Sequence, residues 1–109
     1  MNLPSPIRTY FEADGKPDAA APMGAFATDA VVEDEGRSYR GCAAIESWWR
    51  KAKAQNQHVA EPIAIADRGD VTEVRAKVSG NFTGSPAELT FAFRLSDLED
   101  AIVGLRIGA

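Results

Sequence analysis

Apolar and polar residues alternate through most of the second half of the chain, and this pattern limits the fold more than any other feature. The apolar positions are Ile63 and Ile65, then Val74, Ala76 and Val78, then Leu89, Phe91, Phe93 and Leu95, and last Val103, Leu105 and Ile107. A period of two residues is typical of strands that bury one face. The connecting segments 67–70, 81–86 and 96–100 are rich in residues that favour turns. We therefore expect an antiparallel meander of four strands.

The N-terminal part of the chain predicts two short helices. Ser5 can cap the first helix, and Gly15 can stop it. Apolar residues recur there at three- and four-residue spacing, and Tyr10 is one of them, so its side chain should face inward. Asp18 can cap a second short helix over residues 19–27. The two helices together would form a helix hairpin.

Two short strands and a third helix are expected between this hairpin and the meander. Residues 30–34 form a β-branched run, and residues 37–40 can return as a strand after a turn at Gly36. The third helix spans about residues 42–54. Its apolar face holds Ile45, Trp48, Trp49 and Ala52, and its polar face holds Glu46, Arg50, Lys51 and Lys53. A face with two tryptophans requires a broad apolar surface to pack on.

Size and charge indicate one globular domain over residues 1–109. The chain is 45% hydrophobic and 26% charged, which is ordinary for such a domain. Its formal net charge of -4 repels phosphate backbones, so we expect no nucleic acid partner. No run approaches the roughly 20 apolar residues of a membrane span, and residues 1–14 lack a basic leader. We therefore expect a cytoplasmic protein with no membrane partner.

Cysteine and histidine each occur once, as Cys42 and His58. A single cysteine cannot form an intrachain disulfide. Neither residue has the second member that a zinc site requires, and no dense carboxylate cluster is present. We therefore expect no metal ion and no cofactor.

The order of these elements resembles the nuclear transport factor 2-like superfamily, which includes ketosteroid isomerases and the SnoaL-like polyketide cyclases. The segment Phe26-Ala-Thr-Asp-Ala-Val-Val-Glu-Asp34 is similar to the Phe-Ala-Asp-Asp-Ala-Thr-Val-Glu-Asp segment of the isomerases, and Tyr39-Arg-Gly41 and Ala44-Ile45 follow it. The resemblance covers nearly the whole chain. It implies an α+β fold of the cystatin-like type, in which a cone-shaped, curved antiparallel sheet wraps around three helices. Such an α+β barrel leaves a hydrophobic pocket at its open end.

The resemblance also implies roles for two residues. In the isomerases a tyrosine on the first helix donates a hydrogen bond to the dienolate oxygen, and the aspartate that ends the segment shuttles the proton. Tyr10 and Asp34 match these positions, as oxyanion donor and general base. The isomerases have a second acid that donates to the same oxygen, and this sequence has Phe91 there. The oxyanion site would thus lose one of its two donors.

Other residues are candidates for binding a ligand in the pocket. They are Trp48, Trp49, His58, Phe82, Phe91 and Phe93. Each has a simpler structural interpretation, because tryptophans on a helix face usually pack in a core and a lone histidine at a strand end is usually exposed. Asp34 could likewise be a solvated carboxylate at a strand end, and Tyr10 could serve packing alone.

The sequence therefore leaves two functions open. The first is a protein with a pocket for a small apolar molecule that acts as a cofactor-independent isomerase or cyclase on a carbonyl compound. The alternative is a non-catalytic ligand-binding or dimerisation module of the same fold. In both cases we expect a homodimer through the sheet, because a four-stranded meander with few helices leaves sheet surface uncovered. Arg75, Lys77, Arg94 and Arg106 would lie on that surface.

Overall fold

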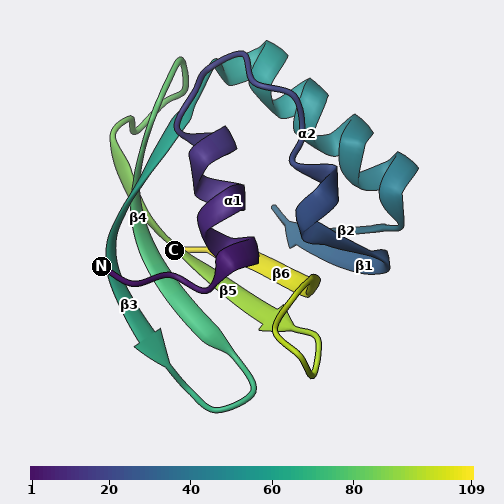
Figure 1. The fold of residues 1–109 in the computed structure, drawn as a ribbon. Helices are drawn as coiled ribbons and strands as arrows, with labels where there is room; N and C mark the ends of the chain where they lie inside the picture. Colours follow the sequence, from purple (N-terminus) through teal and green to yellow (C-terminus); the bar gives the residue numbers. More distant parts are fainter.

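The computed structural model describes residues 1–109 and contains two α-helices and six strands (Figure 1). The elements are α1 (Ser5–Asp14), the short 3₁₀ helix η1 (Met23–Ala25), β1 (Phe26–Asp34), β2 (Arg37–Arg40), α2 (Cys42–Asn56), β3 (Val59–Asp67), β4 (Thr72–Ser79), β5 (Ala87–Leu95) and β6 (Ile102–Gly108). Neither helix is long and apolar enough to cross a membrane.

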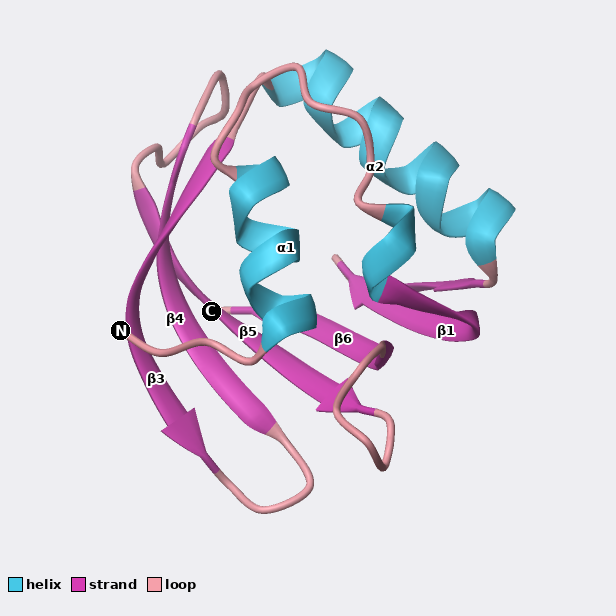
Figure 2. Cartoon of the chain, in the orientation of Figure 1, coloured by secondary structure: helices cyan, strands magenta, loops and turns pink.

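The six strands form one curved, unclosed sheet in the order β2-β1-β6-β5-β4-β3. Strands β3 to β6 pair as the antiparallel meander that the alternation predicts. Figures 1 and 2 show the sheet bending around α1, with α2 lying across the open side of the curve. The fold is therefore the expected α+β cone, with both helices on the concave face.

The second helix is the main error in the sequence-based prediction. Residues 19–22 have no helical structure, only Met23–Ala25 form a 3₁₀ turn, and β1 begins at Phe26. Pro22 explains the difference, because proline lacks the amide that a helix needs and disfavours helical geometry in the residue before it. The sheet accordingly wraps around two α-helices, where three were expected.

Two further predictions need correction. The sheet is mixed and not purely antiparallel, since β1 runs parallel to β6 while pairing antiparallel with β2. The β1–β2 hairpin thus extends the free edge of the meander. At the start of α1 the N-cap is Pro4, and Ser5 is already helical and makes no capping bond.

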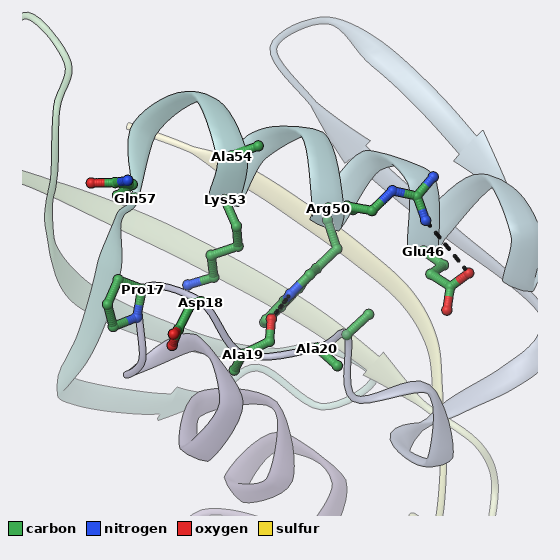
Figure 3. Close-up of a pocket in the computed structure, with 11 residues that line it drawn as sticks. Pro17, Asp18, Ala19, Ala20, Glu46, Arg50, Lys53, Ala54 and Gln57 are labelled. Atoms are coloured by element: carbon green, nitrogen blue, oxygen red, sulfur yellow. Dashed lines mark hydrogen bonds and ion pairs between the residues drawn. The ribbon is translucent and has the colours of Figure 1, made fainter.

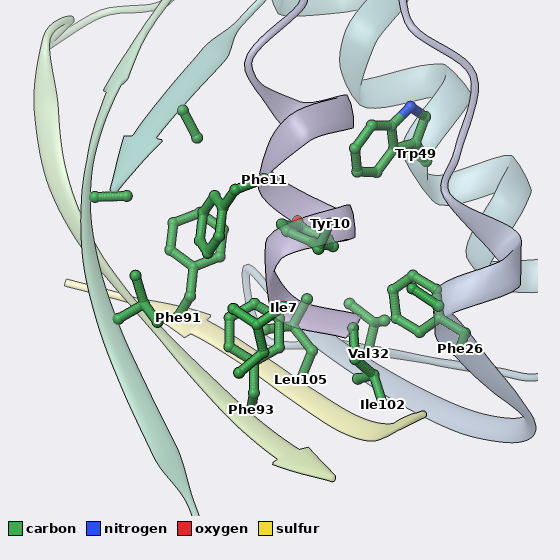
Figure 4. Close-up of a cluster of buried hydrophobic side chains, with 14 of the residues drawn as sticks. Ile7, Tyr10, Phe11, Phe26, Val32, Trp49, Phe91, Phe93, Ile102 and Leu105 are labelled. Carbon is green, nitrogen blue, oxygen red and sulfur yellow. The ribbon is translucent and has the colours of Figure 1, made fainter. Parts of the chain in front are cut away.

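A cluster of aromatic rings fills the cone and fixes α1 to the sheet (Figure 4). Tyr10 lies at its centre and packs edge to face on Phe11, Trp49 and Phe93, with ring centroids 5.2 to 5.5 Å apart. Phe91 packs on Phe11 at 5.2 Å. Aromatic side chains bury about 150 to 250 Å² each, so this cluster supplies much of the hydrophobic stabilisation.

Candidate functional site

A cavity of about 970 Å³ lies between the sheet and the two helices. It is lined from α1 by Tyr10 and Asp14, from the β1–β2 region by Asp34, Glu35, Arg37 and Tyr39, and from α2 by Ala44, Ser47, Trp48, Trp49, Lys51, Ala52, Gln55 and Asn56. The remaining lining residues are His58, which precedes β3, and Val78, Phe82, Thr83, Leu89, Phe91 and Ile107 of the meander and its loops. Its size is that of a pocket for a small organic ligand.

The cavity brings together nearly all the residues that the sequence suggested as a site. Tyr10, Asp34, Trp48, Trp49, His58, Phe82 and Phe91 all line it. Phe93 does not. The side chain of Phe93 has the same orientation as that of Phe91, two positions away, but it is fully buried beneath the rings of Tyr10 and Phe11. Phe93 is therefore a core residue with no surface for a ligand.

Asp34 is held by an indole. Strand alternation places it on the same face as the buried Val32, at the end of β1. The Nε1–H of Trp48 donates a hydrogen bond to Asp34 Oδ2 at 3.0 Å. The Trp48 ring in turn lies 6.1 Å from the ring of Tyr39. The carboxylate therefore has a fixed direction, and Oδ1 has no protein donor in this structure.

The two tryptophans differ as their adjacent positions on a helix require. Trp49 is buried in the core, and its Nε1–H donates to the carbonyl oxygen of Ala19 at 2.9 Å. Trp48 is only partly buried and reaches Asp34. The indole of Trp49 therefore fixes the segment before η1 to α2, while the indole of Trp48 belongs to the polar part of the cavity.

Tyr10 is a phenol kept in its neutral form. Its side chain is only 1% exposed. Burial raises the pKa of Tyr10 well above the usual 10.0, and the nearby carboxylates of Asp14 and Asp34 raise it further, with a hydrogen bond to Asp14 adding to the effect. Tyr10 is therefore a hydrogen-bond donor at every pH near neutrality.

A buried polar cluster next to Tyr10 escaped the sequence analysis. Lys53 Nζ lies 2.7 Å from Asp14 Oδ1, 2.8 Å from the carbonyl oxygen of His58 and 3.3 Å from that of Asp14. His58 Nε2 lies 3.2 Å from the same Asp14 Oδ1. Both Asp14 and Lys53 are almost fully buried, so the placement of Lys53 on the polar face of its helix was wrong. Helical spacing held the signal, because each residue lies four positions after a core aromatic, Tyr10 and Trp49 respectively.

The remaining wall of the cavity is apolar. Val78, Phe82, Leu89, Phe91 and Ile107 come from the meander and its loops. Phe91 is nearly fully buried, at the position where the isomerase pattern has a second acid. The side chains that the meander strands contribute to the cavity are thus all apolar, and its polar groups come from the helices, the β1–β2 hairpin, His58 and Thr83.

A smaller groove of about 580 Å³ lies outside the cone, between residues 17–21 and α2 (Figure 3). Glu46 and Arg50 form an ion pair at its rim with 4.0 Å between Oε1 and Nη1, and both are exposed. Exposed pairs of this kind contribute little to stability. Because the inner cavity is larger and holds the buried titratable groups, it is the candidate site.

Comparisons with known proteins agree with this geometry. The sequence matches no family model and no curated protein sequence at a significant level. Among solved structures, a candidate polyketide cyclase of Sinorhizobium meliloti is 47% identical, with 96% of this chain and 94% of the other covered and a TM-score of 0.88. A Catenulispora acidiphila protein with a ketosteroid isomerase-like fold, solved in complex with trimethylamine, is 18% identical over 99% and 87% of the two chains, with a TM-score of 0.80. A SnoaL-like protein of Burkholderia thailandensis is 16% identical over 93% and 88%, with a TM-score of 0.72.

The fold and the cavity define an α+β cone protein, and the two more distant structures support that fold alone. The S. meliloti relative decides the family, because it is similar in sequence over nearly the full length of both chains. The chain belongs to the nuclear transport factor 2-like superfamily, among its SnoaL-like and ketosteroid isomerase-like members. The resemblance seen in the sequence is thereby confirmed.

Proposed function

We propose that the cavity binds a small apolar carbonyl compound and catalyses its isomerisation or cyclisation without a cofactor, with Asp34 as general base and Tyr10 as oxyanion donor. One observation carries this proposal. A carboxylate with one oxygen free of protein donors and a phenol kept neutral by burial line the same largely apolar cavity, and the charge of Asp34 acts on the phenol.

The chemistry requires a proton to leave the carbon next to a carbonyl. Asp34 Oδ1 would take that proton, and the electron pair of the broken C–H bond would move toward the carbonyl oxygen as an enolate forms. A hydrogen bond from Tyr10 would stabilise the negative oxygen. Isomerisation returns the proton to another carbon, whereas cyclisation uses the enolate to attack a second carbonyl. The name of the S. meliloti relative, a candidate polyketide cyclase, supports this reaction class.

Tyr10 has only one proton to give. Its hydroxyl faces the Asp14 carboxylate, which helps to raise the pKa of Tyr10 through its charge and by hydrogen bonding. To donate to a ligand, the hydroxyl must turn from Asp14 toward the cavity. This change is favourable only if Asp14 keeps other donors, and Lys53 supplies one at 2.7 Å. The buried lysine therefore makes the proposed role of Tyr10 physically feasible.

The first prediction tests the base. Asp34→Asn keeps the shape of the side chain but cannot accept a proton, so we expect exchange of α-protons and isomerisation of β,γ-unsaturated cyclic ketones to fall by about 10² to 10⁴. Glu33→Gln is the matched control. Glu33 is the preceding residue of β1, points to the other face and pairs with Arg106 at 3.4 Å. Deuterium exchange followed by NMR measures the rates. Equal losses in both variants would contradict a specific role for Asp34.

A binding module without catalysis is the second candidate. It is favoured by the hydrogen bonds that Asp34 and Tyr10 already make within the protein, since such bonds also serve a purely structural role. Saturable binding of small ketones, with background exchange rates in the wild type and in Asp34→Asn alike, would favour this function. The homodimer and the cytoplasmic location also stay predictions.

A further inference from the structure

Asp14 and Lys53 assist Tyr10 in the function proposed above, but His58, the third member of their buried cluster, has no part in it. The cluster lies at the cavity beside Tyr10, and two of its members, Asp14 and His58, line the cavity wall. A buried ion pair costs desolvation energy and is not needed for stability as such. The effect of the cluster on His58 is therefore its most informative property.

The cluster fixes one ring nitrogen of His58 and leaves the other without a protein partner. Nε2 lies 3.2 Å from the carboxylate of Asp14 and must carry a proton to interact favourably with it. No hydrogen bond within the protein involves Nδ1. Every buried polar side-chain atom of the chain has a hydrogen-bond partner, so Nδ1 is not a buried atom. Nδ1 is therefore accessible to solvent or a ligand, and the side chain is 18% exposed.

The backbone of His58 is held as firmly as its ring. Lys53 donates to its carbonyl oxygen at 2.8 Å. On the other side, Gly80 passes so close that a Cβ built there would lie 2.8 Å from His58 Cα. Together these contacts hold His58 in one position at the cavity, which is what an active-site group requires.

A carbonyl or enolate oxygen in this cavity can accept two hydrogen bonds. Tyr10 can supply one. The indole N–H groups already have acceptors, since Trp48 donates to Asp34 and Trp49 donates to the carbonyl of Ala19. Phe91 and its neighbours on the meander offer none. Other donors such as Ser47, Gln55 and Thr83 line the cavity, but His58 is the lining donor that contacts the Asp14 carboxylate beside Tyr10.

We propose that His58 is a catalytic residue that donates the second hydrogen bond to the substrate oxygen through Nδ1, and that Asp14 is the positioning residue that orients its ring. The inference rests on the proposed function and adds a donor to it. It also gives the chain a replacement, from a different part of the fold, for the acid that Phe91 displaces.

A hydrogen bond to the substrate needs a proton on Nδ1, in addition to the Nε2 proton that an interaction with the Asp14 carboxylate requires. As Asp34 removes the carbon proton, the electron pair moves through the new C=C bond to the carbonyl oxygen, and the Nδ1–H stabilises it. When the carbon is protonated again, the Nδ1 proton stays with the imidazole, so the cycle has no net proton change. The titratable groups that surround the ring are Tyr10 and Asp14 from α1 and Lys53 from α2, with Asp34 across the cavity and only apolar side chains from β4 and β5.

Binding of β-naphthol, a flat apolar phenol that resembles a dienol, tests the contact without any turnover. His58 is the only histidine, so protein labelled with ¹⁵N-histidine gives one pair of ring signals. We expect Nε2 to show a bound proton throughout and the Nδ1 signal to shift when β-naphthol binds. His58→Leu should bind β-naphthol about tenfold more weakly. An unchanged Nδ1 signal at saturation would overturn the proposed contact.

Kinetics on β,γ-unsaturated cyclic ketones test the role. His58→Leu should lower kcat by about 10² to 10³, the usual cost of one oxyanion donor. His58→Asn can place an amide N–H near the position of Nδ1, so it should recover part of that loss. Asn81→Ala is the control, since it removes a side chain that bonds Gln57 in the same corner, outside the cavity. Circular dichroism confirms that each variant is folded.

The outcomes separate the two proposals. If Asp34→Asn abolishes turnover while His58→Leu turns over like the wild type, His58 is not a donor and the proposed function stands. If β-naphthol shifts Nδ1 but no ketone reacts, the contact stands and the catalytic proposal fails. If β-naphthol does not bind and no ketone reacts, both proposals fail.

Discussion

Asp14 and Lys53 are charged residues buried in the core of a small domain, and their mutual contacts explain how the fold accommodates them. Lys53 donates hydrogen bonds to the carboxylate and the backbone carbonyl of Asp14 and to the carbonyl of His58. Removing one member of such a pair typically costs about 3 to 5 kcal/mol, because the other charge stays buried alone. The Lys53 side chain thus connects the end of α1, the end of α2 and the residue that precedes β3.

The second prediction concerns Tyr10 and alkaline pH. Its pKa in the folded state is raised, mainly by burial, above the 10.0 expected in the unfolded chain. Above pH 10 the unfolded state therefore loses this proton while the folded state keeps it, so the free energy of unfolding must fall as pH rises until the folded pKa is passed. Tyr10→Phe should remove the part of this alkaline fall in the free energy of unfolding that comes from Tyr10. Urea titrations at pH 9 and pH 11 measure it, with Tyr39→Phe as the control, and an identical alkaline loss in Tyr10→Phe would contradict the prediction.

Residues that carry a motif were easier to predict than residues that depend on contacts between elements. Tyr10 and Asp34 were found through helix spacing and the segment that ends β1, and the structure places both at one cavity. Lys53 was assigned to the solvent because lysine is usually exposed. Lys53 of α2 gains its partner Asp14 only because α1 packs close to α2, and no local sequence pattern predicts that packing.

Elements with a strong period were predicted well. The meander follows from alternation alone, and α2 begins at the expected Cys42 and ends two residues later than expected. The helix prediction for the segment before β1 was wrong. The alanines of this segment favour a helix, whereas Pro22 and the pairing of Phe26 with Ile102 of β6 favour an extended chain. The parallel pairing joins strands far apart in the sequence, so tertiary contacts override local propensity there.

Gly80 permits the close contact between β4 and the end of α2, and the third prediction concerns this contact. A Cβ at this position would lie 2.8 Å from both the Asn56 carbonyl oxygen and His58 Cα. We expect Gly80→Ala to destabilise the protein by about 1 to 3 kcal/mol, as overpacking commonly does. Gly108→Ala is the control, because a Cβ added at Gly108 would meet nothing within 4 Å. Urea unfolding measures both, and equal midpoints for the two variants would contradict the prediction.

At the scale of the whole molecule, the two faces of the sheet differ. Both helices lie on the concave face (Figure 2), and the aromatic core packs on the same face (Figure 4). The other face carries the residues between the buried positions, among them Arg75, which pairs with Glu88, and Arg106, which pairs with Glu33. Two small residues lie on the neighbouring strands, since Ala92 of β5 pairs with Arg106 and Ala64 of the edge strand β3 pairs with Arg75. A face with small residues and charges of both signs is suited to a second copy of itself.

The fourth prediction is that two chains associate through this face. A stable dimer buries about 800 Å² on each partner, roughly an eighth of the 6393 Å² surface of this chain. Ala92 pairs with Arg106 across β5 and β6, near the middle of the uncovered face. Ala92→Lys should therefore block close approach and add like charge, so it should give monomers where the wild type gives dimers. Ala54→Lys, an equal change at an exposed position of α2, should leave the dimer intact. Sedimentation velocity at high micromolar concentration decides between these outcomes. A monomeric wild type would show that the uncovered face is stable in water, and its paired charges would then serve solubility and not association.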